Sequence, residues 1–493
     1  FFLTHKTQSE IPLRLVGSEM CIRDRQYGGC LVLVRDDCRL HDNPALYAAS
    51  EKDVLPVFIL DTHDAKNLGE ASKVWLHHSL EKLNQSLGGK LYFIQGNTID
   101  EIMRLINSEK IDAIYWNKVF EPKQSDKDSE LIDLLKKNGV EHHSFNGSLL
   151  WEPESVLKND GTPYKVFTPF YRKGCMKSES TPREPLPRTK HNFINAKEET
   201  TLSALNLLPN HRWREKIESC WSMGEESAMR RLNHFLENGI QNYKEGRNFP
   251  AKAFVSRLSP HLHFGEISPN QIWFKARAMG DNKNIDHFCS ELGWREFSHY
   301  LIHHFPFMLE ENLNKNFDAF PWDNNEVFIQ SWKSGETGYP IVDAGMRELW
   351  ETGYMHNRVR MIVGSFLVKN LLTHWSYGKD WFNDCLVDAD LANNTASWQW
   401  VAGTGADAAP YFRIFNPVKQ GQDFDKDGEY TKRYLPQLSN MPDKYLFNPW
   451  EAPEEILDVA GVKLGETYPY PIVELKSSRE NALSSFSQIK KKK

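Results

Sequence analysis

Residues 30–60, CLVLVRDDCRLHDNPALYAASEKDVLPVFIL, place two apolar runs on either side of a polar segment. The runs CLVLV (30–34) and VLPVFIL (54–60) have the continuous apolar character of strands that are buried on both faces of a sheet. Between them, Asp42 or Asn43, with the proline that follows, is typical of a helix start. The stretch therefore predicts a strand, a helix and a second strand.

The same alternation continues to about residue 150. Further strands are predicted at 90–95 (KLYFIQ), 111–116 (IDAIYW) and 141–145 (EHHSF), and helices at 72–87, 98–110 and 125–139. Alternating strands and helices of this kind are typical of a doubly wound parallel sheet, so we expect an α/β domain over 26–150. The first strand is followed by RDDCRLHDN rather than G-x-G-x-x-G, and the sheet domain is therefore a poor candidate for the main cofactor.

The chain changes character after this domain. Residues 151–223 are rich in Pro, Lys, Ser and Glu and show little periodicity outside YKVFTPFYR (164–172), which predicts a long connector between domains. From 224 to 485 nearly every apolar pattern has helical spacing, which predicts an all-α domain. We expect 486–493 to be a solvated basic tail.

Residues 1–25 do not fit the rest of the chain. They lack a starting Met, hydrophobic periodicity and the apolar core of a signal peptide, and the run VGSEMCIRDR resembles translated sequencing-adapter DNA. We treat this leader as non-native and expect it to be disordered or poorly packed.

The amino-acid composition and net charge limit which classes of function are possible. The 493 residues are 40% hydrophobic and 26% charged, which is typical of a globular protein with two or three domains, and no run is long enough to span a membrane. The net charge of −6 excludes a protein that coats nucleic acid non-specifically, so any DNA contact must be a local patch. Seven cysteines without a C-x-x-C pair, and histidine pairs without ligand spacing, predict no metal site and a reducing cytoplasm.

Residues 381–413, WFNDCLVDADLANNTASWQWVAGTGADAAPYFR, mix carboxylates, amides and indoles between apolar runs. Buried polar groups must find partners, so this density indicates a bound ligand that is both polar and aromatic. We interpret the stretch as the floor of a flavin pocket. Asn394 and Trp398 are four residues apart and would share one helix face.

Three other motifs have both functional and structural interpretations. Ser256, Arg257 and Ser259, just before a helix start, suit a pyrophosphate, but they also suit an ordinary capped loop. Glu291 and Trp294 share one helix face, and 353–361 (GYMHNRVRM) carries two arginines, but core packing or a solvated face would explain either motif.

Together these motifs resemble the photolyase/cryptochrome family, over about residues 30–485. The resemblance rests on RLHDNPAL (39–46), YKVFTPF (164–170), SRLSP (256–260), ELGWREF (291–297), TGYPIVDAGMREL (337–349), MHNRVRM (355–361) and DADLANN…WQW…DAAPYFRIFNP (388–417). It implies an α/β antenna domain and a helical domain that binds FAD. The closest likeness is to class I-type photolyases, which use light and reduced FAD to repair cyclobutane pyrimidine dimers (CPDs) in DNA.

The resemblance also implies roles for individual residues. Residues that hold FAD would be Tyr243, Ser256, Arg257, Leu258, Ser259, Phe288, Asn357, Arg360, Asp388, Asp390 and Asn394, with Arg360 paired to Asp388. Residues that bind a flipped-out dimer or its flanking DNA would be Glu291, Trp294, Arg295, Arg358, Met361, Trp400 and Arg413. Trp398, Trp375 and Trp322 match the series that carries electrons to the flavin.

Several positions distinguish branches of this family. Asn357 and Met361 stand where (6-4) photolyases have histidines, and Asn394 stands where plant cryptochromes have an aspartate that can protonate the flavin. The helical domain contains only Cys289 and Cys385, too few for a four-cysteine iron–sulfur cluster. These differences favour a CPD photolyase. We expect a monomeric cytoplasmic enzyme that works on UV-damaged DNA in the bacterial nucleoid.

The antenna side departs most from the family. Residues 31–39 (LVLVRDDCR) replace the usual opening, whereas Phe288 and Val255 are milder changes near FAD. Arg35 and Glu121 could line an antenna cleft that holds methenyltetrahydrofolate or 8-hydroxy-5-deazaflavin, or the cleft is empty. Two other functions stay open: a blue-light-sensing cryptochrome with little or no repair activity, and a light-independent flavin oxidoreductase, for which no nicotinamide motif is visible.

Overall fold

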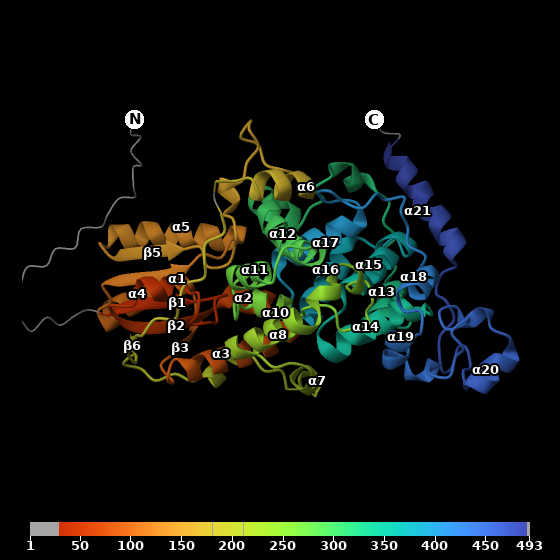
Figure 1. Ribbon diagram of the computed structural model, residues 1–493, viewed down its shortest axis with the longest axis horizontal. Coiled ribbons are helices and arrows are strands. Elements are labelled where there is room, and N and C mark those ends of the chain that lie inside the picture. Colours follow the sequence, from red (N-terminus) through yellow and green to blue (C-terminus); the bar gives the residue numbers. More distant parts are fainter. Residues whose placement is uncertain (1–28, 180, 211, 491–493) are drawn as a thin grey trace, which may run out of the picture.

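The computed structural model describes residues 29–179, 181–210 and 212–490, and it places an α/β domain beside a larger helical domain (Figure 1). The predicted leader, residues 1–25, lies outside the described residues. None of the described helices has both the length and the apolar character needed to cross a membrane.

The α/β domain is built on a parallel sheet with the order β3-β2-β1-β4-β5. Its strands are β1 (Cys30–Val34), β2 (Asp53–Asp61), β3 (Tyr92–Gly96), β4 (Ala113–Asn117) and β5 (Glu141–Phe145). In the centre, Leu31 of β1 pairs with Leu55 of β2 and with Ile114 of β4. The predicted fold class is confirmed, and each predicted strand overlaps an observed one.

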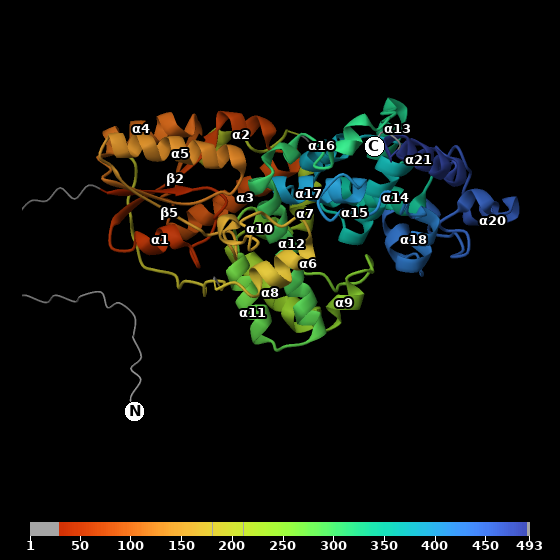
Figure 2. The same ribbon diagram turned by 90° about the horizontal axis from the view of Figure 1, so that it is seen from above.

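Both faces of this sheet are buried, which explains why its strands read as continuous apolar runs. Side chains of β1 alternate between two cores: Val32 packs with α1 (Pro44–Ala48) and α3 (Glu70–Ser86), whereas Leu31 packs with α4 (Thr98–Glu109) and α5 (Pro122–Lys137). Figure 2 shows the sheet between these two helix layers. A short helix, α2 (Thr62–Asn67), follows β2.

The carboxyl ends of β1 and β4 form the point where strand order reverses, which is the usual ligand crevice of such sheets. Polar side chains of the chain itself occupy this point. The Asn117 amide donates to Asp37 Oδ2 at 2.6 Å and to Asn43 Oδ1 at 2.8 Å, and Asn43 in turn caps α1. This arrangement accompanies the missing glycine fingerprint: at this point side chains of the sheet domain hydrogen-bond one another.

The segment 151–223 carries more secondary structure than its composition predicts. Its elements, in which η denotes a short 3₁₀ or π helix, are η1 (Pro153–Ser155), α6 (Phe167–Pro169), η2 (Phe170–Cys175), β6 (Asn192–Phe193), η3 (Leu202–Leu205) and α7 (Trp213–Cys220). Strand β6 pairs in parallel with β2. Buried aromatic residues explain the difference. Phe170 packs into the core of the helical domain and Trp213 into that of the α/β domain, so the segment joins both domains through tertiary contacts.

The rest of the described chain is helical, as predicted. Its elements are α8 (Glu225–Asn238), η4 (Ile240–Asn242), α9 (Tyr243–Gly246), α10 (Ser259–His263), α11 (Pro269–Ala278), α12 (Lys283–His304), η5 (Pro306–Leu309), η6 (Lys315–Ala319), α13 (Glu326–Ser334), α14 (Pro340–Thr352), α15 (Asn357–Ser365), η7 (Phe366–Asn370), α16 (Trp375–Cys385), α17 (Leu391–Ala402), α18 (Pro417–Phe424), α19 (Glu429–Tyr434), η8 (Pro436–Leu438), η9 (Pro449–Glu451), α20 (Glu454–Ala460) and α21 (Leu475–Lys490).

The C-terminal prediction needs a correction. Residues 486–490 belong to α21 and are not a solvated tail, because Phe486 and Ile489 pack against the cluster around Phe317 and Tyr411.

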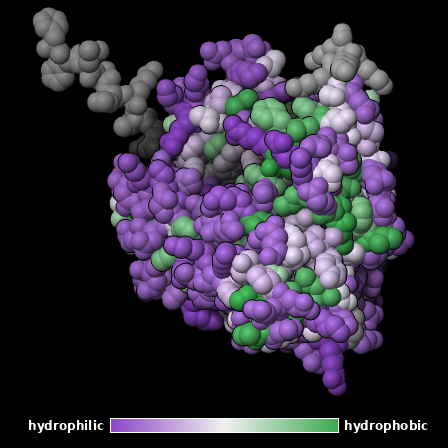
Figure 3. Space-filling view, turned by 90° about the vertical axis from the view of Figure 1, so that its right-hand side faces the viewer, coloured by the Kyte–Doolittle hydropathy of each residue, from purple (hydrophilic) through white to green (hydrophobic). Residues whose placement is uncertain are grey.

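On the face of the molecule shown in Figure 3, hydrophilic and apolar side chains are interspersed. Among the apolar side chains of the described chain, Val459 of α20 is 85% exposed.

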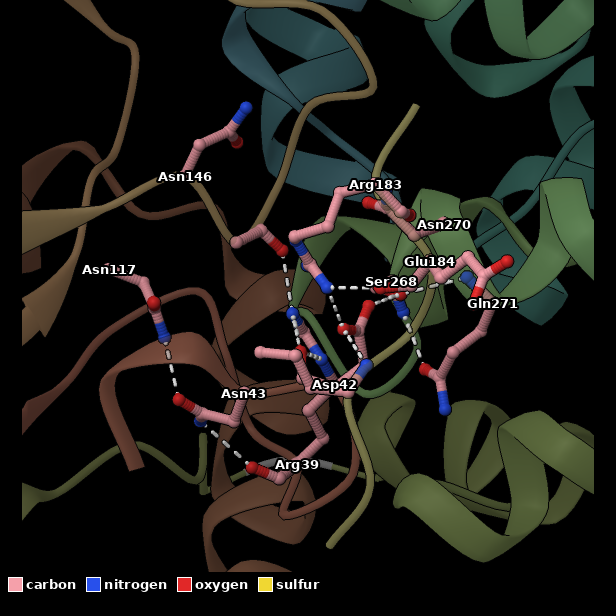
Figure 4. Close-up of polar contacts among 12 residues, drawn as sticks. Arg39, Asp42, Asn43, Asn117, Asn146, Arg183, Glu184, Ser268, Asn270 and Gln271 are labelled. Carbon is pink, nitrogen blue, oxygen red and sulfur yellow. Dashed lines mark hydrogen bonds and ion pairs between the residues drawn. The ribbon is translucent and has the colours of Figure 1, made fainter. Parts of the chain in front are cut away.

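A buried polar network joins the two domains and the connector (Figure 4). The Arg39 guanidinium donates to the carbonyl oxygens of Asp42 and of Gly265. The Asp42 carboxylate is fully buried, pairs with Arg183 of the connector at 2.5 Å, and accepts a hydrogen bond from Ser268 of the helical domain. Because a buried charge is costly without partners, this network favours one docking geometry.

Close backbone contact reinforces that docking. A Cβ on Gly69, at the start of α3, would lie 1.8 Å from the carbonyl oxygen of Asn383 in α16. Next to it, the Glu70 amide donates to Asp384 and Ser72 Oγ donates to the Leu386 carbonyl. The α/β domain therefore braces the end of α16.

We expect Gly69→Ala to lower the free energy of unfolding by about 2 kcal/mol, because backbone atoms cannot move aside for the added methyl group. Gly96→Ala is the control, since its Cβ would meet only the flexible Glu101 side chain, at 3.1 Å. Urea denaturation of the purified proteins measures both. Equal loss of stability in the two variants would contradict close interdomain contact at Gly69.

Candidate functional site

A cavity of about 500 Å³ lies inside the helical domain, between α9, α10, α12, α15, α16 and α17. Its size is typical of ligand pockets. The predicted site residues that line it are Tyr243, Ser256, Leu258, Ser259, Phe288, Glu291, Trp294, Arg295, Asn357, Arg360, Met361, Asp388, Asp390, Asn394, Trp398 and Trp400. Motifs that lie far apart in the sequence therefore meet in one place.

Other predicted residues lie outside this lining. Arg257 is the clearest case: its backbone is left-handed, at φ 53°, and its guanidinium lies over the rings of Trp221 and Tyr354, 4.4 and 4.8 Å from their centroids. Arg358 lies over Phe424 and donates to Asn248 at 2.6 Å. Arg413, Trp375 and Trp322 are also outside the lining, and Arg35 and Glu121 belong to the α/β domain.

One wall of the cavity is organised by Asp388. Its Oδ2 accepts hydrogen bonds from Ser259 Oγ at 2.5 Å and from Arg360 Nη2 at 2.8 Å. The predicted Arg360–Asp388 pair is thus confirmed. Asp388 Oδ1 is buried and has no hydrogen-bond partner among the described residues. Such an orphan acceptor is suited to a donor from a bound ligand.

Asp390 stabilises the start of α17. Its carboxylate accepts a hydrogen bond from the backbone N–H of Asn393 at 2.7 Å and lies 3.3 Å from the ring of His299 and 3.9 Å from that of His263. Burial alone would raise the pKa of Asp390, but His299 and His263 hold this pKa well below its ordinary value. Asp390 is therefore a carboxylate throughout the physiological pH range.

Asn394 lies one turn into α17. Its Nδ2 donates to the Lys379 carbonyl of α16 at 3.0 Å, which fixes the amide against the cavity wall. Trp398 follows on the same face, as predicted, and is 3% exposed. Its ring packs so closely against α16 that a Cβ on Gly378 would lie 2.1 Å from it.

Another part of the lining combines aromatic rings with an ion pair. Trp294 stacks on Phe167 with ring centroids 3.8 Å apart and an interplanar angle of 11°. Glu291 forms a close ion pair with Arg247. The sequence analysis missed Arg247, which also lines the cavity, because its partner lies 44 residues away in the chain and no local pattern joins them.

A buried histidine precedes the lining residue Asn357. His356 caps α15 and is 3% exposed. Burial lowers its pKa to about 3, and Arg247 and Arg360 contribute to the same shift. Arg247 is paired with Glu291, and Arg360 with Asp388. Their guanidinium groups still offer N–H donors of the kind that suit an anionic ligand such as a diphosphate.

The three tryptophans of the predicted series differ in burial and in their contacts. Trp398 lines it, Trp375 is fully buried at the start of α16, and Trp322 is partly buried. The ring of His374 lies between the last two, 5.1 Å from Trp375 and 5.3 Å from Trp322. Exposure therefore increases from Trp375 to Trp322, and of the three tryptophans only these two are linked by ring contacts through His374.

Comparisons with known proteins cover nearly the whole chain. A family model described as DNA photolyase matches residues 30–190, and one described as the FAD binding domain of DNA photolyase matches 288–488. The deoxyribodipyrimidine photo-lyase of Agrobacterium fabrum is 44% identical over 94% of this chain and 98% of its own length. The chain belongs to the photolyase/cryptochrome family.

Solved structures and plant relatives extend this result. The crystal structure of a bacterial class III photolyase from Agrobacterium tumefaciens matches with a TM-score of 0.92 and 43% identity, over 96% of this chain and all of that one. Class III is a branch that the sequence analysis did not consider. Cryptochrome-2 of Arabidopsis thaliana is 35% identical over 93% of this chain and 79% of its own length.

The cavity fits the FAD that the family model implies. The hydroxyls of Ser256 and Ser259 and the guanidinium of Arg360 suit a diphosphate. The orphan Asp388 Oδ1 and the buried Trp398 Nε1, which has no partner among the described residues, suit a polar aromatic ring system. No cluster of three or more metal-ligating side chains occurs in the part of the chain that the structure describes.

We expect Gly378→Ala to push Trp398 into the cavity and so reduce bound flavin, while lowering the free energy of unfolding by about 1–3 kcal/mol. The flavin-to-protein absorbance ratio and urea denaturation measure the two effects. Gly364→Ala is the control, because its Cβ would lie 3.6 Å from the same ring and would meet the Val401 side chain first, at 3.1 Å. Equal flavin content in Gly378→Ala and Gly364→Ala would contradict the close fit of Trp398.

Proposed function

We propose that this protein is a light-dependent deoxyribodipyrimidine photo-lyase that repairs CPDs in DNA, as a monomer working at the bacterial nucleoid in the cytoplasm. One observation carries the proposal. A single cavity joins a polar wall that suits FAD, at Ser259, Arg360 and Asp388, to an aromatic pair, Trp294 and Trp400, that suits two unstacked pyrimidines. The photo-lyases among the relatives support it.

The polar wall would hold the cofactor. Tyr243, Ser256, Leu258, Ser259 and Phe288 would contact its phosphate and ribityl region, and Asn357, Arg360, Asp388, Asp390 and Asn394 its ring system. Arg257 would contribute indirectly, by shaping the loop before α10. Reduced FAD, when bound, supplies the electron that opens the cyclobutane ring, and the electron returns without net redox change.

Trp294 and Trp400 would receive the lesion. A pyrimidine dimer stacks poorly in a duplex, so its extrusion costs less than that of a normal base pair. Aromatic walls recover part of this cost, and stacking on such a wall contributes about 1–3 kcal/mol per base. Met361 would pack against the dimer, and Glu291 would accept hydrogen bonds from its base edge. In the free protein the ion pair with Arg247 orients this carboxylate.

Arginines would hold the flanking strand. Arg295, Arg358 and Arg413 are the predicted DNA contacts, and a few such contacts suffice for a small footprint on an acidic protein. Trp398, Trp375 and Trp322 would pass electrons from the surface to the cavity wall. In support, Trp375 and Trp322 are linked by ring contacts through His374.

An antenna pigment is a separate proposal. Arg35 and Glu121 remain candidates for a site that holds methenyltetrahydrofolate or 8-hydroxy-5-deazaflavin. The Arg35 guanidinium pairs with Asp128 at 2.8 Å, so a ligand there would contact a preformed ion pair.

A blue-light-sensing cryptochrome is the alternative, and the plant relatives favour it. Such a protein would keep the flavin cavity but repair little or no DNA. The neutral amide of Asn394 favours repair instead, because an amide carries no titratable proton to give to the reduced cofactor.

The deciding experiment is CPD loss from a UV-irradiated thymine oligonucleotide, incubated with the reduced protein under blue light or in the dark. We expect loss only in the light. A bound, photoreducible flavin without repair would instead establish the cryptochrome alternative.

We expect Asn394→Asp to destabilise the anionic reduced flavin and to lower the repair yield about tenfold, since one pKa unit changes the ratio of protonation states tenfold. Absorption spectra after photoreduction and the repair assay measure the two effects. Asn393→Asp, which places the same carboxylate one residue away, should have a smaller effect. Unchanged spectra and repair in Asn394→Asp would remove the proposed role of this amide.

A further inference from the structure

Lys369 is a charged side chain in an unusual place. It lies in η7, the π-helical turn that continues α15, and it is only 1% exposed. No carboxylate lies within ion-pair distance of it among the residues that the structure describes. Burial alone lowers its pKa to about 8. A buried ammonium group without a counter-ion needs other polar partners, and the partners of Lys369 are informative.

All of the partners belong to one turn of the chain. The Lys369 ammonium donates to the Arg413 carbonyl at 3.0 Å and to the Pro410 carbonyl at 3.5 Å, and it lies 5.4 Å from the ring centroid of Tyr411. The Arg413 amide closes the turn by donating to the Pro410 carbonyl at 2.9 Å. Lys369 thus holds the turn Pro410–Arg413 across more than 40 residues of sequence.

The same turn separates an anchor from an exposed pair. Tyr411 is 2% exposed and packs on Phe320 and Phe486, with ring centroids 5.2 and 4.9 Å away. Phe412 is 55% exposed and Arg413 is also exposed. Tyr411 is buried, and Lys369 binds the carbonyls of Pro410 and Arg413. The exposed side chains of the turn are therefore the Phe412 ring and the Arg413 guanidinium.

This turn is connected directly to the cavity wall. The Ala409 amide donates to the carbonyl of Trp400 at 3.1 Å, and both Trp400 and Ala406 line the cavity. A ring and a guanidinium beside a cavity that receives bases are the groups that bind a nucleic-acid strand, through stacking and phosphate contact.

We propose that Lys369 is a positioning residue for DNA binding, which holds the turn Pro410–Arg413 so that Arg413 and Phe412 engage the strand beside the lesion. This inference rests on the proposed repair function. Lys369 itself does not touch DNA, because its side chain is buried beneath the turn. Its effect must therefore act through Arg413 and Phe412.

The test compares Lys369→Met, Arg413→Ala and the double variant in binding to a CPD-containing duplex, as holoproteins at several salt concentrations. Each phosphate contact contributes about 0.9 to the slope of log K against log salt, so we expect Lys369→Met to reduce this slope by about one, as Arg413→Ala does. We expect each single variant to weaken binding about three- to tenfold, and the loss in the double variant to be smaller than the sum of the two single losses, because both variants remove the Arg413 contact.

The flavin content and the repair yield per bound dimer should stay at the wild-type level in Lys369→Met. Lys463→Met is the control, since it removes an exposed lysine that is paired with Glu466. Additive losses in the double variant, an unchanged salt slope, or a parallel loss of flavin would each overturn the inference.

If Lys369→Met fails to fold, Lys369→Gln takes its place, because its amide can still donate to one carbonyl. Failure of both variants to fold would assign Lys369 a purely structural role and overturn the inference. If the wild type repairs the duplex and Lys369→Met binds it equally well, the inference is overturned while the proposed function stands. A wild-type protein that neither binds nor repairs the duplex would overturn the proposed function as well.

Discussion

The ion pair between Arg360 and Asp388 is the constraint on which the cavity depends. It joins α15 to the turn between α16 and α17, and Ser259 adds α10 to the same carboxylate. Removing one partner of such a buried pair typically costs about 3–5 kcal/mol, because the other charge is left without compensation. The α/β domain supports this wall from outside, since α3 docks on α16 through Gly69 and Ser72, close to Asp388. The sheet domain thus acts on the site through backbone contact, while the helical domain supplies the lining.

Charge at the cavity is balanced, although the chain as a whole is acidic. The net charge is −6, whereas the lining has as many arginines as carboxylates: Arg247, Arg295 and Arg360 against Glu291, Asp388 and Asp390. The low pKa of His356 is a consequence of burial and of nearby arginines. Local fields of this kind decide binding at a site, and the net charge mainly limits non-specific association.

The sequence predicted the sheet well because β1 and its neighbours are buried on both faces, so a continuous apolar run signals a strand whatever its partners are. It predicted the polar cavity wall because 388–400 concentrates polar groups in one helix start. Tertiary contacts were not predictable in the same way. The connector reads as irregular because Phe170 and Trp213 find their partners in distant domains, and Arg247 pairs with Glu291 without a local pattern. Arg257 shares a motif with Ser256, but its left-handed backbone points it to Trp221 and away from the cavity.

The account places the cofactor and the lesion in one cavity, and a crystal structure of the holoprotein bound to a duplex with a single CPD tests this claim most directly. We predict that the dimer lies outside the base stack, between Trp294 and Trp400, with Glu291 at its base edge and Arg413 on a neighbouring phosphate. A dimer that stays stacked in the duplex, or that binds away from these residues while FAD occupies the cavity, would contradict the account.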